Sequence, residues 1–223
     1  MTDHKGKLSP LLKQATGITA AKGEGAYIVD TDGRRYLDFT SGIGVTSTGH
    51  CHPKVVEAAQ KQVATMIHAQ ATTVMNPRLP ELAEKLGALT PDPLNAFFFS
   101  NAGTEVAEGA IRLVRQVTGR PNIIVFHGGF HGRTMGSLSM TTSSVGLRAG
   151  VSPMMGGVVV SPFPHAFHYG WSEDEATDFC LKELDRIFVT YSAPKETAAM
   201  LIEPVQGEGG YVPANARFMQ GLR

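Results

Sequence analysis

Three short stretches of this sequence combine glycines with side chains that can do chemistry. The first, Ser100-Asn101-Ala102-Gly103-Thr104, is a small polar turn directly after the apolar run Ala96–Phe99. A helix that begins in this turn offers free backbone N–H groups and the positive end of its dipole, which suits a phosphate. Gly103 allows a ligand to approach the backbone closely, and the Thr104 hydroxyl is a further donor. A plain helix cap without a ligand is the alternative.

The second stretch, His127 to Thr134, places an aromatic ring, two histidines and an arginine in one glycine-rich loop. Phe130 and His131 can stack on a planar cofactor, and the forked guanidinium of Arg133 can bind both oxygens of a carboxylate. A metal site is disfavoured, because the glycines prevent a regular helix and the glutamate of a zinc-protease helix is missing. A solvent-exposed loop with a surface arginine is the other interpretation.

The third stretch, Ile202 to Gly210, carries two glutamates, Glu203 and Glu208, in a loop after an apolar run. A carboxylate near an arginine can form an ion pair that opens and closes with the charge of a substrate. The alternative is that one or both glutamates are solvated loop charges.

Other glycine and histidine patterns in the chain do not complete a known ligand motif. Gly42-x-Gly44 and Gly207-x-Gly209 fail the dinucleotide-binding fingerprint, because Ser47 and Val212 stand where its third glycine belongs. His50-Cys51-His52 has no further side chains at metal-ligand spacing, so roles in a turn and at a helix start are expected there.

The elements that must position these stretches can be read from the hydrophobic pattern. Near the N-terminus, Tyr27–Asp30 and Arg35–Phe39 flank the turn signal Thr31-Asp32-Gly33 and predict a hairpin. Further along, apolar runs alternate with amphipathic segments. The strands expected there are Ala96–Phe99, Asn122–Phe126, Gly157–Val160 and Ala198–Ile202, and the helices expected are those starting at Pro53, at Pro80, after Thr104, after Ser172 and near Asn215.

This alternation predicts an α/β fold with a mostly parallel sheet that is covered by helices on both faces. Ser172 and Glu175 have the spacing of a capping box, for a helix that runs to about Tyr191. Gly119 is expected to end the helix that follows Thr104, in the left-handed conformation.

The composition of the 223-residue chain limits the classes of partner that we expect it to bind. Hydrophobic residues make up 42% and charged residues 18%, and 20 basic side chains balance 20 acidic ones. No nucleic-acid or membrane partner is expected, because such partners favour a basic excess. Cys51 and Cys180 suit a reduced compartment rather than a disulfide framework. The N-terminus has no apolar leader, so a cytoplasmic protein is expected.

In their order and spacing, these stretches resemble the class III aminotransferases among the fold-type-I pyridoxal phosphate enzymes, and most closely those that act on 4-aminobutyrate. The likeness covers nearly the whole chain and is carried by the segments Tyr36–Val45, Gly49–Val55, Phe99–Glu105, Gly129–Thr134 and Ile202–Gly210. It implies that residues 1–48 form an N-terminal segment of the small domain, including the hairpin. Residues 49–223 would then be the first part of a cofactor-binding large domain, cut off before its end.

The resemblance also implies roles for the residues around the cofactor. Gly103 and Thr104 would hold the phosphate of pyridoxal 5'-phosphate. Phe130 would stack on its pyridine ring with His131 beside it, and Glu203 would lie near the cofactor.

On the substrate side, the resemblance implies that Ile43 lines the pocket and that Arg133 binds the carboxylate far from the reacting amine. Glu208 would act as a gate that pairs with a mobile arginine, which in the family lies further along the chain. The implied partners are a small amino donor, 4-aminobutyrate above all, and a 2-oxo acid acceptor such as 2-oxoglutarate. A homodimer or larger homo-oligomer is implied for the full-length form.

The Schiff-base lysine of the family has no counterpart here. Lys54 and Lys61 fall on an amphipathic helix, and Lys195 lies in a turn. No catalytic residue is therefore assigned, and we expect the chain alone not to transaminate. The alternatives are an acetylornithine or ornithine aminotransferase, a related aminomutase or racemase, and a non-catalytic truncated product.

Overall fold

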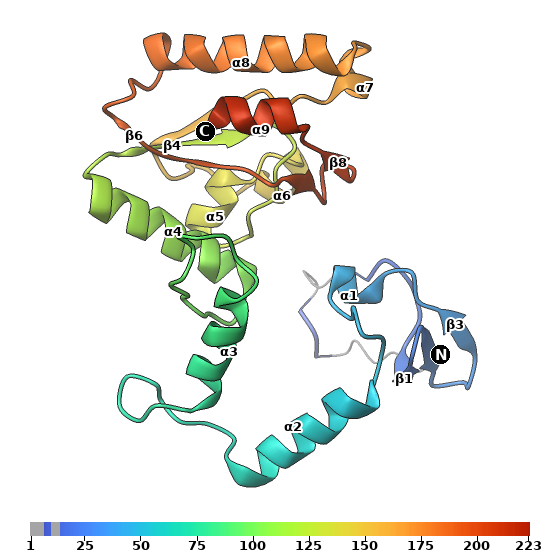
Figure 1. Ribbon diagram of the computed structural model, residues 1–223. Coiled ribbons are helices and arrows are strands. Elements are labelled where there is room, and N and C mark those ends of the chain that lie inside the picture. The colour runs from blue at the N-terminus through green and yellow to red at the C-terminus, as the bar shows by residue number, and fades with distance from the viewer. Residues whose placement is uncertain (1–6, 10–13) are drawn as a thin grey trace. The chain divides into compact units, whose positions relative to one another are not determined.

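The computed structural model describes residues 7–9 and 14–223, and the chain divides into two compact units, Met1–Ala96 and Phe97–Arg223 (Figure 1). The domain boundary expected between residues 48 and 49 falls inside the first unit and stays a prediction.

A three-stranded antiparallel sheet forms the start of the first unit. It has the order β1-β2-β3, with β1 at Ala20–Glu24, β2 at Tyr27–Asp30 and β3 at Arg35–Leu37. The expected hairpin is thereby confirmed. Its turn is held by Asp30, whose carboxylate accepts hydrogen bonds from two turn amides and from the Tyr36 hydroxyl at 2.8 Å. Strand β1 was not expected, because Ala-Ala-Lys-Gly-Glu shows no apolar alternation.

Three helices follow this sheet in the described part of the first unit. They are α1 at Ser41–Gly44, α2 at Pro53–Thr65 and α3 at Arg78–Gly87. Pro53 opens α2, as expected from the fixed φ of proline at a first helical position. The expected turn and helix-start roles of His50-Cys51-His52 are confirmed, since Cys51 has a φ of 53° and His52 is the N-cap of α2.

A parallel sheet lies at the centre of the second unit, in the order β5-β4-β6. Strand β4 is Asn122–Phe126, β5 is Val158–Ser161 and β6 is Thr197–Leu201, and β4 pairs in parallel with both neighbours. Ile124 and Val125 of β4 are completely buried, one on each face of the sheet. The predicted α/β fold with a parallel sheet is confirmed.

Helices cover both faces of this sheet (Figure 1). On one face α4 (Gly103–Thr118) and α5 (Met135–Met140) pack against Ile123 and Val125. On the other face α8 (Glu173–Thr190) and α9 (Ala216–Leu222) pack against Ile124 and Phe126. The two faces follow from the alternation of side chains along β4. In the described part of the chain, no helix has the length and hydropathy to cross a membrane.

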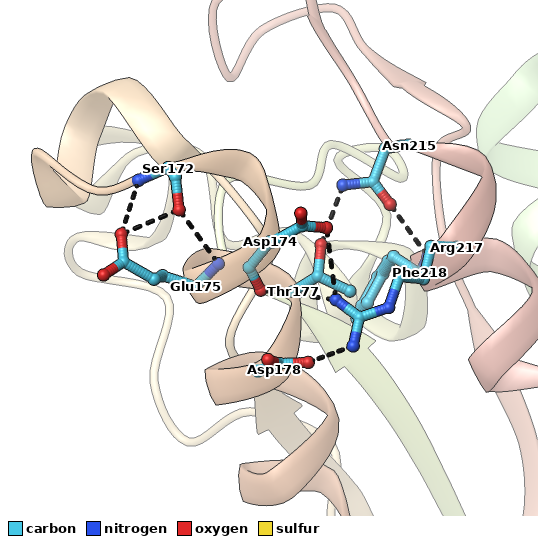
Figure 2. A network of polar contacts seen from close by, with 8 residues as sticks. All are labelled: Ser172, Asp174, Glu175, Thr177, Asp178, Asn215, Arg217 and Phe218. Carbon is cyan, nitrogen blue, oxygen red and sulfur yellow. Dashed lines mark hydrogen bonds and ion pairs between the residues drawn. The ribbon is translucent and has the colours of Figure 1, made fainter.

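The ends of the long helices follow the sequence signals. Helix α8 begins with the expected capping box, in which the Ser172 hydroxyl accepts from the Glu175 amide and the Glu175 carboxylate accepts from the Ser172 amide at 2.9 Å (Figure 2). Helix α4 ends at Gly119, which has the expected left-handed conformation with a φ of 67°.

Side chains at the start of α9 form a hydrogen bond and ion pairs with α8. The amide of Asn215 donates to the Thr177 hydroxyl at 2.7 Å, while its carbonyl oxygen caps α9 by accepting from the Phe218 N–H at 2.8 Å (Figure 2). Arg217 forms ion pairs with Asp174 and Asp178 of α8. Because Phe218 is fully buried between the helices and β4, α9 is an integral part of this layer.

One predicted element needs correction. Ala96–Phe99 is not a strand, and in the described part of the chain it has no paired neighbour, so its apolar run lacks the ladder partners that define a strand. Phe98 is 81% exposed rather than buried. Short elements went unpredicted, namely α5, α6 (Val145–Arg148), α7 (Ala166–Tyr169), and the hairpin of β7 (Val205–Gln206) with β8 (Val212–Pro213).

Candidate active site

A cavity of about 640 Å³ in the second unit collects most of the predicted site residues. It lies where α4 begins and where the chain leaves β4. The predicted residues that line it are Gly103, Thr104, Phe130, His131 and Arg133.

The topology of the sheet explains why a ligand site forms here. After β4 the chain crosses to the face covered by α4 and α5, and after the adjacent strand β6 it crosses to the face covered by α8 and α9. In open α/β sheets a crevice forms at the carboxyl ends of two neighbouring strands whose connections diverge in this way, and ligands bind there. The loops after β4 and β6 contain Phe130 and Glu203, so both lie at this crevice.

The N-terminus of α4 presents unpaired backbone donors to the cavity. Its N-cap, Ala102, has no side chain that can cap the helix. Within the described part of the chain, the amides of Gly103 and Thr104 have no protein acceptor, and the space beside Gly103 is open. Two free N–H groups at the positive end of a 16-residue helix make a favourable site for an anion.

Thr104 connects this helix end to the start of α5. Its hydroxyl lies 2.8 Å from the Thr134 hydroxyl and 2.6 Å from the Ser137 hydroxyl. The loop passes so close that a Cβ on Gly132 would come within 2.4 Å of the Thr104 hydroxyl. Gly132, with a φ of 131°, therefore allows the loop after β4 to reach the helix end.

Glu108 is a residue of this network that the sequence prediction missed. One turn after Thr104 on α4, its carboxylate accepts hydrogen bonds from the Thr134 hydroxyl and from the Ser137 amide at 3.0 Å. Burial raises the pKa of Glu108, but these hydrogen bonds outweigh that effect and leave the pKa below its usual value. The spacing of four residues from Thr104 was the available signal, since it places both side chains on one helix face.

Glu203 holds the loop that carries Phe130. One carboxylate oxygen accepts from the Phe130 N–H at 2.6 Å, and the other accepts from the Gly207 N–H at 2.9 Å. A single side chain at the end of β6 thus ties together the loops that follow β4 and β6. Charge-assisted bonds of this kind are about twice as strong as neutral ones.

His131 is held from the backbone while its ring remains unsatisfied. Its N–H donates to the Thr141 hydroxyl at 2.9 Å, and that hydroxyl donates to the Gly132 carbonyl at 2.9 Å. The ring atom Nε2 is buried and has no hydrogen-bond partner in the described part of the chain. Burial lowers the pKa of His131, against the opposing charge of Glu203, so the ring is neutral near pH 7.

Arg133 is the cationic side chain of the cavity wall. It is exposed, and no ion pair occupies its guanidinium in the described residues. An arginine in this state is available to a carboxylate, because both prongs of its fork are free.

Glu208, a predicted substrate residue, lies outside this cavity. Glu208 lines a different cavity of about 590 Å³, together with His127, Tyr169 and Gln206. Ile43 belongs to the first unit, where its side chain is 90% exposed. The structure therefore brings Gly103, Thr104, Phe130 and His131 together with Arg133 in one cavity, and Glu203 is linked to it through the Phe130 N–H. Glu208 lines another cavity, and the role of Ile43 in the substrate pocket stays a prediction.

Comparison with known proteins finds similarity to aminotransferases along nearly the whole chain. A family profile described as aminotransferase class-III matches residues 11–223. A probable 4-aminobutyrate aminotransferase of Bacillus subtilis is 39% identical, over 90% of this chain and 47% of the relative. A 5-aminovalerate aminotransferase of Pseudomonas putida is also 39% identical, over 88% of this chain and 45% of the relative. The chain spans about half the length of the curated relatives it matches.

Solved structures share the fold. An amine transaminase from an uncultivated Pseudomonas species, solved in its pyridoxal phosphate-bound form, superposes with a TM-score of 0.90 at 25% identity and covers all of this chain and 53% of its own. The residues that line the cavity fit pyridoxal phosphate, and this holds apart from the comparisons. The cavity has uncovered amides for a phosphate, an aromatic ring from Phe130, and a buried nitrogen on His131 that lacks a partner. The chain belongs to the class III aminotransferases, a family whose cofactor is pyridoxal phosphate.

Proposed function

We propose that this chain forms the first part of an aminotransferase that moves an amino group from an ω-amino acid, with 4-aminobutyrate the first choice, to 2-oxoglutarate. The observation that supports the proposal is that an uncapped helix end, an aromatic ring and a free arginine line one and the same cavity. These three features match the phosphate and ring of the cofactor and a carboxylate of the substrate.

The cofactor, when bound, supplies the electron-withdrawing ring on which amino transfer depends. The residues of this chain would bind and orient it. The free amides of Gly103 and Thr104 would bind the phosphate and Phe130 would pack on the ring, while Glu203 fixes Phe130 through its backbone. His131, neutral and half-buried beside Phe130, offers the buried nitrogen Nε2 for a hydrogen bond without adding charge.

Arg133 selects the substrate class in this proposal. A guanidinium binds a carboxylate in two-pronged geometry, so it favours donors that carry an acid group, which the family resemblance puts far from the amine. Donors of this kind are named for the Bacillus subtilis and Pseudomonas putida relatives, 4-aminobutyrate and 5-aminovalerate. Ile43 would add an apolar wall to the pocket. Glu208 would pair with an arginine outside this chain while the donor is bound and release it when 2-oxoglutarate arrives.

We also propose that the full-length enzyme is cytoplasmic and forms a homodimer or a larger homo-oligomer. Its support here is the apolar face of α2, where Val55 is 53% and Val63 is 60% exposed. Apolar side chains in a row on an amphipathic helix favour a covering partner.

Calorimetric titration of the chain with pyridoxal 5'-phosphate and with pyridoxal tests the cofactor site. We expect the phosphate-bearing compound to bind about tenfold tighter or more, because charge-assisted hydrogen bonds contribute about 1.5–3 kcal/mol. Thr104→Val should reduce this difference. Thr118→Val, at the other end of α4, is the matched control and should not. Equal affinity for both compounds would exclude the proposed phosphate site.

A second experiment tests the substrate class. The chain is joined to the part of the Bacillus subtilis relative that it does not match, and amino transfer to 2-oxoglutarate is assayed. We expect 4-aminobutyrate to be a better donor than 1-aminobutane, which lacks the carboxylate, and Arg133→Gln to abolish this preference. A preference that survives Arg133→Gln would assign the carboxylate to another residue.

A further inference from the structure

The turn that carries Ile43 has an unusual backbone. Ser41, Gly42, Ile43 and Gly44 all have positive φ angles, of 49°, 62°, 66° and 74°, so α1 is a left-handed turn rather than an ordinary helix. Glycine adopts this conformation readily. Serine and isoleucine do not, because their Cβ atoms approach the following carbonyl oxygen.

Neither backbone preference nor burial accounts for an isoleucine at position 43. A β-branched residue in the left-handed region is a true outlier, and a third glycine would fit this turn better. The side chain is 90% exposed, so it gains nothing from packing in the described chain. Residues held in such conformations cluster at functional sites, where the surrounding structure forces them.

Asp38 supplies the contacts that force this turn. Its Oδ1 atom accepts hydrogen bonds from the Thr40 N–H at 2.9 Å, from the Thr40 hydroxyl at 2.6 Å and from the Ser41 N–H at 3.1 Å. These donors belong to the residue before the turn, Thr40, and to the first residue of the turn, Ser41. The carboxylate therefore fixes the point at which the chain enters the turn.

The other oxygen of Asp38 is anchored to His50. Its Oδ2 atom lies 2.8 Å from His50 Nε2, and the side chains are only 4% and 20% exposed. His50 is itself fixed, because its backbone exchanges two hydrogen bonds with Gly25, at 2.7 and 3.0 Å. Its ring lies against β1 so closely that a Cβ on Gly23 would come within 2.6 Å of it. Hydrogen bonds through Asp38 and His50 thus link the turn to the sheet.

We propose that Asp38 is a positioning residue for substrate recognition, and that it holds the left-handed turn Ser41–Gly44 so that Ile43 is presented to the substrate. The substrate part of this inference rests on the proposed function. The structural part does not, and it can be tested on this chain without cofactor.

The test is NMR of the chain with the Cα and Cβ chemical shifts of the isoleucines as the signals, because these shifts depend on the backbone φ and ψ. In Asp38→Ala, we expect the Ile43 signals to move from left-handed values towards random-coil values, while the signals of Ile28 in β2 and Ile124 in β4 stay in place. Asp38→Asn should restore the Ile43 signal in part, because an amide oxygen still accepts from Thr40 and Ser41. Asp32→Ala, in the exposed turn between β2 and β3, is the matched control and should leave Ile43 unchanged.

Two outcomes would overturn the proposal. If the Ile43 signal is the same in wild type and Asp38→Ala, the glycines alone set the turn. If Ile28 moves as far as Ile43 in both Asp38 variants, Asp38 merely stabilises the whole unit. A failure of cofactor or donor binding, with the Ile43 response intact, would instead count against the proposed function alone.

Discussion

The carboxylate of Glu203 receives the backbone N–H of Phe130 at 2.6 Å, although 73 residues separate them in sequence. Its second oxygen receives the N–H of Gly207. This one side chain therefore determines where the aromatic ring of the cavity stands relative to the end of β6.

Replacing Glu203 with glutamine should weaken this arrangement, because an amide has only one oxygen for two N–H donors. We expect the free energy of unfolding to fall by about 1–3 kcal/mol, the cost of an unsatisfied buried donor. Urea unfolding measures it. Glu208→Gln is the matched control, since Glu208 is exposed, and should change stability by less than about 0.5 kcal/mol. Equal effects of both substitutions would contradict the role given to Glu203.

Gly132→Ala should displace the loop from the end of α4. The new Cβ would clash with the hydroxyls of Thr104 and Ser137, at 2.4 and 2.5 Å. We expect a loss of about 1–3 kcal/mol in stability together with weaker binding of pyridoxal 5'-phosphate. Gly146→Ala is the control, because its nearest neighbour would lie at 3.5 Å. A Gly132→Ala protein with unchanged melting temperature and cofactor affinity would refute the close approach.

The first unit should lose stability in acid. Hydrogen bonds from Thr40, together with His50, lower the pKa of Asp38 from 3.8 to about 2. A carboxylate with a lowered pKa stabilises the folded state above its unfolded value, and that contribution disappears as the pH falls from about 3.8 to about 2. The Ile28 methyl signal, followed during acid titration, should report this loss. Asp38→Asn should remove the part of the pH dependence that falls in this window.

The two cysteines should differ in reactivity. Cys51 is exposed, while Cys180 is fully buried and burial raises the pKa of its thiol to about 12. Since the thiolate is the nucleophile, iodoacetamide at pH 8 should label Cys51 and leave Cys180 unmodified until the protein unfolds. Peptide mass spectrometry separates the two sites, and rapid labelling of Cys180 in the native protein would contradict its placement in the core.

Cofactor bound to this chain should not be trapped on a lysine. No lysine is among the described residues that line the cavity of Thr104 and Arg133. Borohydride reduction in the presence of pyridoxal 5'-phosphate should therefore give no adduct at a single site. A stoichiometric adduct on one lysine would show that the chain supplies its own Schiff-base partner.

Several elements of this fold depend on residues that lie close together in sequence, so they could be predicted. Strand β4 and helices α4 and α8 were predicted because apolar periodicity, Gly119 and the pair Ser172 and Glu175 all act within a few residues. The run Ala96–Phe99 was mispredicted because apolar character is local, whereas strand formation depends on a partner far away in sequence.

The same distinction applies to the site. Gly103 and Arg133 stand in recognisable loops, so their types and positions were informative. Glu108 and Thr141 were missed, because their function is to hold the loop after β4, and that follows only from hydrogen bonds across 10 to 29 residues. The separation of Glu208 from the cavity of Arg133 also depends on how two loops pack, which no motif encodes.

The position of α9 has a consequence for chain direction. The crossover from β5 over α8 to β6 travels towards the β6 side of the sheet, and α9 lies on the same face as α8. Right-handed crossovers on one face all advance in the same direction. The outer side of β6, where Met200, Ile202 and Leu222 line a groove, is therefore the side towards which connections on this face advance.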